Sequence, residues 1–289
     1  MAAPQKTLSV FLAWLAAAVL AAQAASPRRI VSLVPNVTEI VYALGAGGRM
    51  VGVSSYDTYP PDVKQLPNVG ALLDPNVERI LSLKPDLVIL YGSQEDLKQQ
   101  MAKAGIAVYS YRHSGLDGVT ATIRDLGART GERSAADTLA ARIQRGLDEV
   151  RQRVGGRPRP RTLLVFGRER LSLRGMYVSG GVGFLNDMLN AAGGENVFAD
   201  VRTESVQAST EQIIARRPDV IIEVRAANSG FPSGERDAEL RTWNTLGSVP
   251  AVRNHRVLFL FDDRIVIPGP RVVDGTLVIA RALHPDAFK

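Results

Sequence analysis

The sequence lacks cysteine altogether and contains only three histidines. The absence of cysteine excludes disulfides, thiolate metal ligands, thiol nucleophiles and a lipid attached to a processed N-terminal cysteine. His113, His255 and His284 lie far apart in the sequence and form no pair with the spacing of a metal site. Only His113, just after a predicted strand, is expected near a cleft. We therefore predict no cofactor and no metal held by the protein's own side chains.

Motifs of common hydrolases are also missing. The sequence has no Gly-x-Ser-x-Gly nucleophile elbow and no His-Glu-x-x-His metal motif. Surface carboxylates without a neighbouring base do not make a catalytic pair. The glycine-rich stretch at 179–183, "SGGVG", lacks the Gly-Lys-Ser/Thr end of a nucleotide-binding loop, which leaves a tight turn or an anion contact. We expect no enzyme activity, and a secreted α/β hydrolase is the alternative from another class.

The first 25 residues are predicted to be a signal peptide. Lys6 precedes an apolar run at 8–22, and the small residues of "AAQAAS" follow. A transmembrane anchor would need about 20 apolar residues. We therefore expect cleavage near Ala24 or Ala25 and export, and an exported chain without a lipid-bearing cysteine fits the periplasm. The net charge of +6 is spread among acidic residues, so no nucleic acid partner is expected.

The remaining chain has the pattern of an α/β protein with two domains. Its length of about 264 residues suits two cores rather than one. Short runs rich in Val, Ile and Leu alternate with helical stretches, which is typical of a parallel sheet covered on both faces. The predicted strands are 29–34, 50–54, 86–91, 107–111, 161–167, 219–224 and 256–261, and helices are predicted at 184–192 and 272–283. We predict two Rossmann-like lobes with central parallel sheets.

A long amphipathic stretch at 134–154 separates the two halves. Its apolar residues recur at spacings of three and four, and they are Leu139, Ile143, Leu147, Val150 and Val154. Such a helix is about 30 Å long, enough to span both lobes. We predict an N-terminal lobe at 26–130, a rigid connecting helix at 131–156 and a C-terminal lobe at 157–289. Ligand is expected in the cleft between the lobes, which changes shape only modestly.

One twelve-residue segment of the sequence occurs twice in similar form. The stretch at 78–89, "ERILSLKPDLVI", returns at 211–222 as "EQIIARRPDVII". Five of the twelve aligned positions are identical and four more are conservative. The two copies stand near the middle of each half, which indicates an internal duplication.

Five blocks in order resemble the periplasmic binding proteins of ABC importers that carry metal chelates, namely cobalamin, ferric siderophores and haem. The blocks are "RIVSLVPNVTEIVYALG", "VGVSSYDTYPPDV", "PNVERILSLKPDLVI", "GGENVF" and "EQIIARRPDVII". This family has two lobes joined by one long helix. The resemblance implies that Glu78 and Glu211, one on each lobe, dock onto arginines of a dimeric permease. Their alternative role is to favour the dipole of the helix that each one begins.

A metal chelate is large and partly flat, so its receptor needs aromatic faces and polar contacts at the strand ends. The candidates are Pro35, Asn36, Tyr56, Tyr59, Tyr91, Phe166, Arg168, Asp263 and Arg264. "SSYDTYPP" resembles the cobalamin branch, although Leu72 and Ser205 stand where tryptophan is frequent. Arg168, Arg170 and Arg174 instead suit an anionic siderophore or haem. We therefore expect a monomer that binds cobalamin or a related corrinoid, with a ferric siderophore or haem as the alternative.

Overall fold

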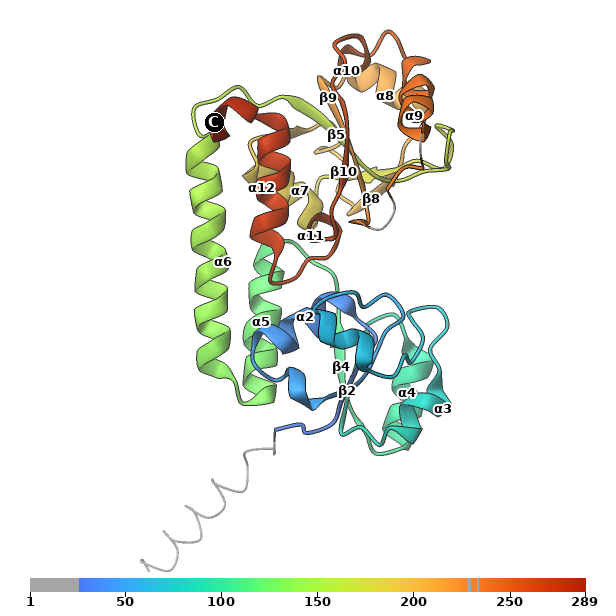
Figure 1. Cartoon of the computed structure of the whole chain (residues 1–289), viewed down its shortest axis with the longest axis vertical. Coiled ribbons are helices and arrows are strands. Elements are labelled where there is room, and N and C mark those ends of the chain that lie inside the picture. The colour runs from blue at the N-terminus through green and yellow to red at the C-terminus, as the bar shows by residue number, and fades with distance from the viewer. Residues whose placement is uncertain (1–25, 228–229, 233) are drawn as a thin grey trace, which may run out of the picture.

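The computed structural model describes residues 26–227, 230–232 and 234–289. The predicted signal peptide at 1–25 lies outside the described residues. Two α/β lobes lie one above the other beside a long helix, which runs along both of them (Figure 1). Within the described ranges, no helix has both the length and the apolar character needed to span a membrane.

The N-terminal lobe contains a sheet of four parallel strands in the order β2-β1-β3-β4. The central strands β1 and β3 are almost wholly buried runs of Val, Ile and Leu, as expected for strands covered on both faces, whereas residues of the edge strand β4 are partly exposed. The strands are β1 Ile30–Ser32, β2 Met50–Val53, β3 Leu87–Tyr91 and β4 Ala107–Tyr111. The helices are α2 Pro35–Ala43, α3 Val77–Ser82, α4 Glu95–Lys103 and α5 Leu116–Thr130, with 3-10 turns η1 Gly47–Arg49 and η2 Pro61–Gln65.

The C-terminal lobe contains a mixed sheet in the order β10-β9-β5-β6-β8, with β7 paired to β5. Its strands are β5 Arg161–Gly167, β6 Tyr177–Ser179, β7 Glu195–Asn196, β8 Ser205–Gln207, β9 Val220–Arg225 and β10 Val257–Phe261. Its helices are α7 Phe184–Ala191, α8 Thr210–Arg216, α9 Glu235–Asn244, α10 Pro250–Arg253, α11 Asp263–Val266, α12 Val272–Leu283 and η4 Pro285–Phe288.

The predicted parallel pairing is confirmed for β5, β9 and β10. Strands β6 and β8 add two antiparallel pairs that the sequence analysis did not predict. The connection from β5 to β6 is a loop without a crossover helix, and such a connection returns the chain antiparallel beside the strand it has just left. The α/β fold with two lobes is therefore confirmed, with a parallel first sheet and a mixed second one.

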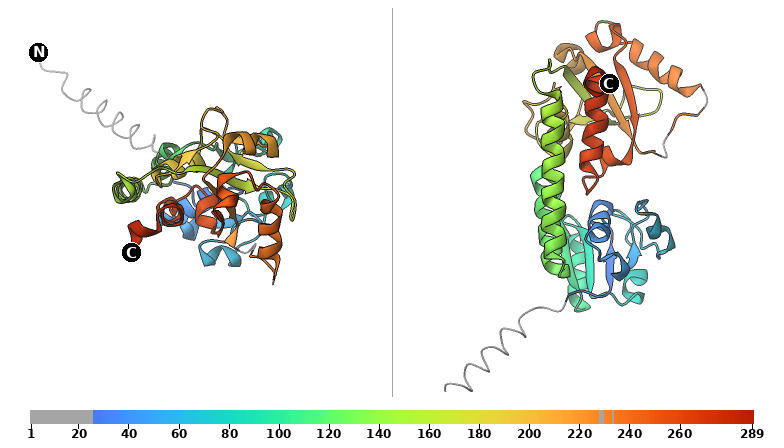
Figure 2. Two further views of the ribbon diagram at one scale, coloured as in Figure 1. Left: turned by 90° about the horizontal axis from the view of Figure 1, so that it is seen from above. Right: turned by 60° about the vertical axis from the view of Figure 1, so that its left-hand side comes forward.

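The connecting helix is α6, Arg133–Val154. Its buried residues include the whole apolar stripe predicted from the sequence, namely Leu139, Ile143, Leu147, Val150 and Val154. The helix packs against α5 from the N-terminal lobe and against α12 from the C-terminal lobe (Figure 2). One hydrophobic cluster includes this stripe and strand residues from both lobes. Because α6 is buried along one side over its full length, bending it would open this shared core.

The repeated sequence folds the same way in both lobes. In the first copy, α3 leads into β3, and Asp86 accepts the backbone N–H of Arg29 at 2.9 Å. In the second copy, α8 leads into β9, and Asp219 accepts the backbone N–H of Arg161 at 3.2 Å. Both arginine side chains also donate to a carbonyl oxygen at the end of the preceding helix. The duplication is therefore one of structure as well as sequence.

Candidate functional site: the cleft between the lobes

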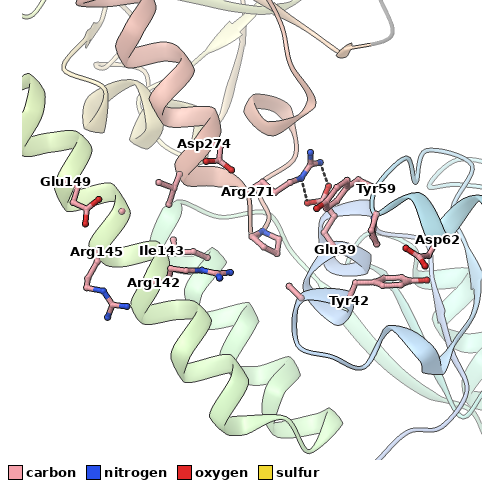
Figure 3. Close-up of a pocket in the computed structure, with 15 residues that line it drawn as sticks. Glu39, Tyr42, Tyr59, Asp62, Arg142, Ile143, Arg145, Glu149, Arg271 and Asp274 are labelled. Atoms are coloured by element: carbon pink, nitrogen blue, oxygen red, sulfur yellow. Dashed lines mark hydrogen bonds and ion pairs between the residues drawn. The ribbon is translucent and has the colours of Figure 1, made fainter. Parts of the chain in front are cut away.

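The two lobes are tied together across the base of the cleft. The Nδ2 of Asn36 on α2 donates to the carbonyl oxygen of Pro268 at 3.2 Å. On the next turn of α2, Glu39 accepts from both Nε and Nη2 of Arg271, the Nε contact being 2.9 Å (Figure 3). The guanidinium of Arg271 also lies 4.1 Å from the ring centroid of Tyr59. We call this group of contacts the interlobe latch.

The latch is largely sheltered from water. The side chains of Glu39 and Arg271 are 3% and 20% exposed. Burial raises the pKa of Glu39, and the hydrogen bond and charge of Arg271 oppose this rise. A bidentate, charge-assisted pair of this kind fixes orientation as well as distance. The latch therefore holds the lobes in one relative position.

A second tie lies at the start of α5. The N-cap residue of this helix, Gly115, has no side chain to offer to the free N–H groups of the first turn. Asp187 of α7 in the other lobe supplies the missing acceptor, because its Oδ2 accepts the N–H of Leu116 at 3.0 Å. With α6, the latch and this cap, the lobes are joined at three places. This arrangement supports the expectation of only modest closure on ligand binding.

An aromatic pocket of about 330 Å³ opens between the lobes. His113, two residues beyond β4, forms one wall, and its ring stacks on Phe184 of α7 with centroids 6.4 Å apart. Phe166 at the end of β5 lies on the C-terminal side. The complete lining is His113, Phe166, Val182, Gly183, Phe184, Leu185, Glu204, Ser205 and Val266. Flat aromatic faces from both lobes therefore meet where the parallel strands end.

His113 is held in place by two tyrosines. Its ring contacts Tyr91 and Tyr111, with centroid distances of 5.8 and 5.2 Å. The hydroxyl of Tyr111 lies 3.4 Å from Nδ1 of His113. Desolvation by these neighbours lowers the pKa of His113, and the charge of Glu204 opposes the shift only in part. The imidazole is therefore neutral at neutral pH and keeps a lone pair for a donor or a metal.

Two of the predicted ligand contacts lie in this region, and four others have different surroundings. Phe166 lines the pocket, and Tyr91 packs beside His113. Pro35 occupies the first turn of α2, and Asn36 is engaged in the latch. Tyr56 is 71% exposed and Tyr59 is 44% exposed, the latter covering the latch arginine.

The structure corrects the prediction for Arg168. Its side chain is 0% exposed, and Glu223 and Glu239 accept its Nε and Nη2 hydrogens at 3.0 and 2.5 Å. Its Nη1 donates to the carbonyl oxygens of Glu169 and Ser172. All its donor groups are thus engaged within the C-terminal lobe, and Arg168 offers no free donor to a ligand in this structure.

Other predicted polar contacts are also committed to the fold. Arg264 donates from Nε and Nη2 to Asp262, at 2.8 and 2.5 Å. Asp263 accepts the N–H of Ala227 at 2.9 Å. Arg170, another arginine of the predicted cluster, pairs with Glu235 and remains 66% exposed. Of the arginines in "GRERLSLRG", Arg168 and Arg170 are thus paired with carboxylates, and Arg174 is exposed.

The glycine-rich loop at 179–183 is a turn that lines the pocket. The N–H groups of Gly180 and Gly181 donate to the carbonyl oxygens of Glu204 and Val201, so they are not free for an anion. Gly183 has φ +91° and begins α7, and a side chain there would be strained and would approach Glu204. The prediction of a tight turn is confirmed for these two amides. The loop leads into α7 and positions Phe184 at the cleft.

A second pocket of about 580 Å³ lies on the α6 side of the latch (Figure 3). Arg142, Arg145 and Glu149 of α6 form one wall, and Glu39 and Arg271 form another. Both signs of charge line it. It therefore separates the latch from the connecting helix without presenting a surface of one charge.

Glu78 and Glu211 occupy equivalent positions, each the second residue of its helix. Both are exposed. Hydrogen bonds from the side chain of Ser209, the N–H of Glu211 itself and Thr210 lower the pKa of Glu211. A carboxylate in the first turn also favours the helix dipole. The geometry is thus compatible with both roles given to these glutamates.

Three pocket residues, Phe184, Glu204 and Val266, were not predicted from the sequence. Phe184 follows the glycine-rich loop and begins a helix, which is a pattern that places an aromatic residue at a helix N-terminus facing the strand ends. Glu204 lies in a bend, and Val266 ends the four-residue helix α11, which is too short for a helical period to be read. Only the folded chain brings these three residues together.

Two α/β lobes, joined by a long helix around an aromatic cleft, define a two-lobed solute-binding protein. A family model described as periplasmic binding protein matches residues 30–263. The chain belongs to this family. It is accordingly a substrate-binding protein of the ABC transporter type, and the family implies an extracytoplasmic location.

Curated relatives and solved structures agree with this assignment. An uncharacterised ABC transporter substrate-binding lipoprotein of Bacillus subtilis is 33% identical over 268 residues, which is 91% of this chain and 82% of that protein. A vitamin B12-binding protein of Yersinia pestis is 34% identical over 205 residues, covering 70% and 71%. The periplasmic haem-binding protein of Roseiflexus sp. superposes with a TM-score of 0.76 at 31% identity, covering 90% and 99%.

Proposed function

We propose that the protein captures a corrinoid, cobalamin or a close relative, and delivers it to an ABC import permease. The aromatic cleft carries this proposal, because His113, Phe166 and Phe184 present flat faces to a flat macrocycle. The B12-binding relative supports the same ligand class. Export through the predicted signal peptide at 1–25 is part of the proposal.

The charges near the cleft favour a ligand of low net charge. Arg168, Arg264 and Arg271 are each paired with a carboxylate. Freeing any of these arginines for an anionic siderophore would leave a sheltered carboxylate without its partner, which is costly. A corrinoid edged with neutral amides makes no such demand. A corrinoid is therefore favoured over a ferric siderophore in this proposal.

Haem is the second candidate, and His113 is the observation that favours it. A neutral imidazole next to two tyrosines at the cleft is a suitable axial ligand for haem iron. The haem-binding protein among the solved structures supports this alternative. With haem, His113 would bind the metal directly, whereas with a corrinoid it would serve as an aromatic wall.

Titration separates these ligands. The purified chain is titrated with cyanocobalamin, hemin and a ferric catecholate siderophore while intrinsic fluorescence and the haem Soret band are followed. Phe184→Ala removes a stacking face and should weaken binding of the true ligand by about 2 kcal/mol, roughly thirtyfold. Leu171→Asn, at an exposed site outside the pocket, is the control and should bind as the wild type does.

His113→Ala distinguishes the two macrocycles. If haem is the ligand, this variant loses the shifted Soret band and most of its affinity. If a corrinoid is the ligand, affinity falls only about as far as in Phe184→Ala. Failure of the wild-type chain to bind any of the three compounds at micromolar concentration would refute the proposed ligand class.

We further propose that Glu78 and Glu211 dock the lobes onto basic residues of the permease. Their equivalent placement at the start of α3 and α8 supports this role, since charge complementarity fixes the orientation of such complexes. Glu78→Gln with Glu211→Gln should leave ligand affinity unchanged and abolish stimulation of transport. Undiminished uptake by vesicles supplied with this double variant would contradict the docking role.

A further inference from the structure

The helices that carry Glu78 and Glu211 each expose an aliphatic side chain one turn later. Leu81 on α3 is 39% exposed, and Ile214 on α8 is 41% exposed. Each lies three residues after its glutamate, and residues at this spacing are neighbours on one helix face. Only eight large hydrophobic side chains are exposed in the ranges that the structure describes, and these two occupy equivalent positions of the repeat.

The two copies differ at other exposed positions of the same helices. Arg79 in the first copy corresponds to Gln212 in the second, and Ser82 corresponds to Ala215. All four residues are exposed. Gln212 has a local task, because its side chain accepts the N–H of Ser209 in a capping box. Within the two helices, the exposed positions that keep their chemistry are therefore the acidic and the aliphatic ones, and just beyond the helices Lys84 and Arg217 are exposed and basic in both copies.

Contact with water does not favour an exposed aliphatic side chain, so solvation does not explain why Leu81 and Ile214 each lie beside a carboxylate. A buried position such as Ile80, or its equivalent Ile213, is kept apolar by the core of its own lobe. Leu81 and Ile214 have no such role over the part of their surface that remains exposed. A protein surface that covers both would explain why the same pair of side chains recurs at the same spacing.

We infer that Leu81 and Ile214 are the apolar contacts through which the two lobes dock on a dimeric membrane permease. This inference rests on the proposed docking role of the glutamates and adds the apolar half of each contact. Two similar patches on one chain are complementary to a partner that presents one surface twice, related by a two-fold axis. Each such surface would combine a basic group with an apolar depression, the usual arrangement of a polar rim beside an apolar centre.

The connecting helix makes this double contact possible. Helix α6 and the latch hold the lobes in a fixed relation, so both patches can engage at once without a further ordering cost. Covering the exposed part of one such side chain is worth roughly tenfold in affinity. Loss of both side chains should then weaken docking by roughly a hundredfold, if the patches act independently.

The test measures binding of the mature chain to its permease in lipid nanodiscs, at 50 and 300 mM salt. The permease used is one whose ATP hydrolysis the wild-type chain stimulates. Leu81→Gln and Ile214→Gln are compared singly and together with Glu78→Gln plus Glu211→Gln. Leu171→Asn is the matched control, because it removes an exposed aliphatic side chain elsewhere in the C-terminal lobe. Thermal unfolding and ligand affinity are measured for every variant.

We expect each single glutamine variant of the aliphatic residues to weaken docking by a similar factor. Their combination should bind roughly a hundredfold more weakly and keep the salt dependence of the wild type. The double glutamate variant should lose that salt dependence. Exchanging the two residues, Leu81→Ile with Ile214→Leu, should restore binding to within about twofold, since apolar contact is retained.

If the double aliphatic variant docks as tightly as the wild type, the inference is wrong. If the double glutamate variant still docks weakly in that case, the acidic contacts are retained and only the apolar contacts are refuted. Two single variants that differ by more than tenfold would contradict two equivalent surfaces. If the glutamate variant also docks like the wild type, the proposed docking face itself is wrong. Ligand binding by all variants would still leave the capture function intact.

Discussion

The buried carboxyl group of Asp57 should make the stability of the protein fall as pH rises toward neutrality. Its Oδ2 accepts the N–H of Ser54 at 2.8 Å, but its buried Oδ1 has no hydrogen-bond partner in the described part of the chain. The neighbouring hydroxyl of Thr38 donates to the carbonyl oxygen of Val34. Burial raises the pKa of Asp57 from 3.8 to about 7, against the opposing effects of Thr38 and Ser54. The folded protein therefore keeps a proton on Asp57 that the unfolded chain has already lost.

The sign and size of the effect follow from linkage. Between pH 3.8 and about 7 the folded state binds one more proton at Asp57 than the unfolded state does, so stability falls as pH rises. Each pH unit within this interval is worth about 1.4 kcal/mol, and the whole interval about 4 kcal/mol as an upper bound. Below pH 3.8 the contribution is fully present, and above about pH 7 it is lost.

Urea unfolding of the wild type and of Asp57→Asn at pH 5 and pH 8 tests this reasoning. The asparagine does not titrate, so the decrease in unfolding free energy from pH 5 to pH 8 should be smaller by about 3 kcal/mol in the variant. Asp62→Asn removes an exposed carboxylate five residues along the chain and serves as the control. Parallel pH profiles for the wild type and Asp57→Asn would refute the assignment of a raised pKa to this carboxylate.

Three further tests probe one buried ion pair of the C-terminal lobe and two contacts between the lobes. Arg168→Met leaves the buried Glu239 without its main partner and should lower the unfolding free energy by about 3–5 kcal/mol in urea, whereas exposed Arg170→Met should lower it by less than about 1 kcal/mol. Arg271→Met should cost about 2–4 kcal/mol, and adding Glu39→Gln should restore part of this loss in thermal unfolding. Asp187→Ala removes the cap of α5 and should cost about 1 kcal/mol by urea unfolding, and no change would mean that the cap contributes nothing.

The connecting helix could be predicted because its pattern is local. The stripe from Leu139 to Val154 depends only on the helical period, and the burial of each of its members confirms it. The strand at 161–167 and the helix at 272–283 agree with the structure to the residue for the same reason. The antiparallel strands β6 and β8 have three residues each, which is too short for a period to be read.

The site was less accessible to sequence reasoning because its members are brought together by packing. Phe166 and Tyr91 lie where strands end, and this position alone was enough to place them near the cleft. Arg168 also follows a strand end, but its partner Glu239 lies 71 positions later in the sequence. No local sequence pattern predicts this ion pair. Position at the end of a parallel strand predicts that a residue lies near the cleft. It does not predict whether the side chain points into the cleft or into the lobe.

By itself, the amino-acid sequence determined the α/β class, the connecting helix and the paired acidic helix starts, because periodicity, composition and repetition are properties of neighbouring residues. Only the tertiary structure decided that Arg168 and Arg271 are bound to carboxylates, and that His113 meets Phe184 across the lobes. The pairs of Arg168 join distant segments of the C-terminal lobe, whereas the contacts of Arg271 and His113 depend on the relative position of the two lobes. That position is set by the shared core along α6, the latch and the cap, which join residues distant in the chain.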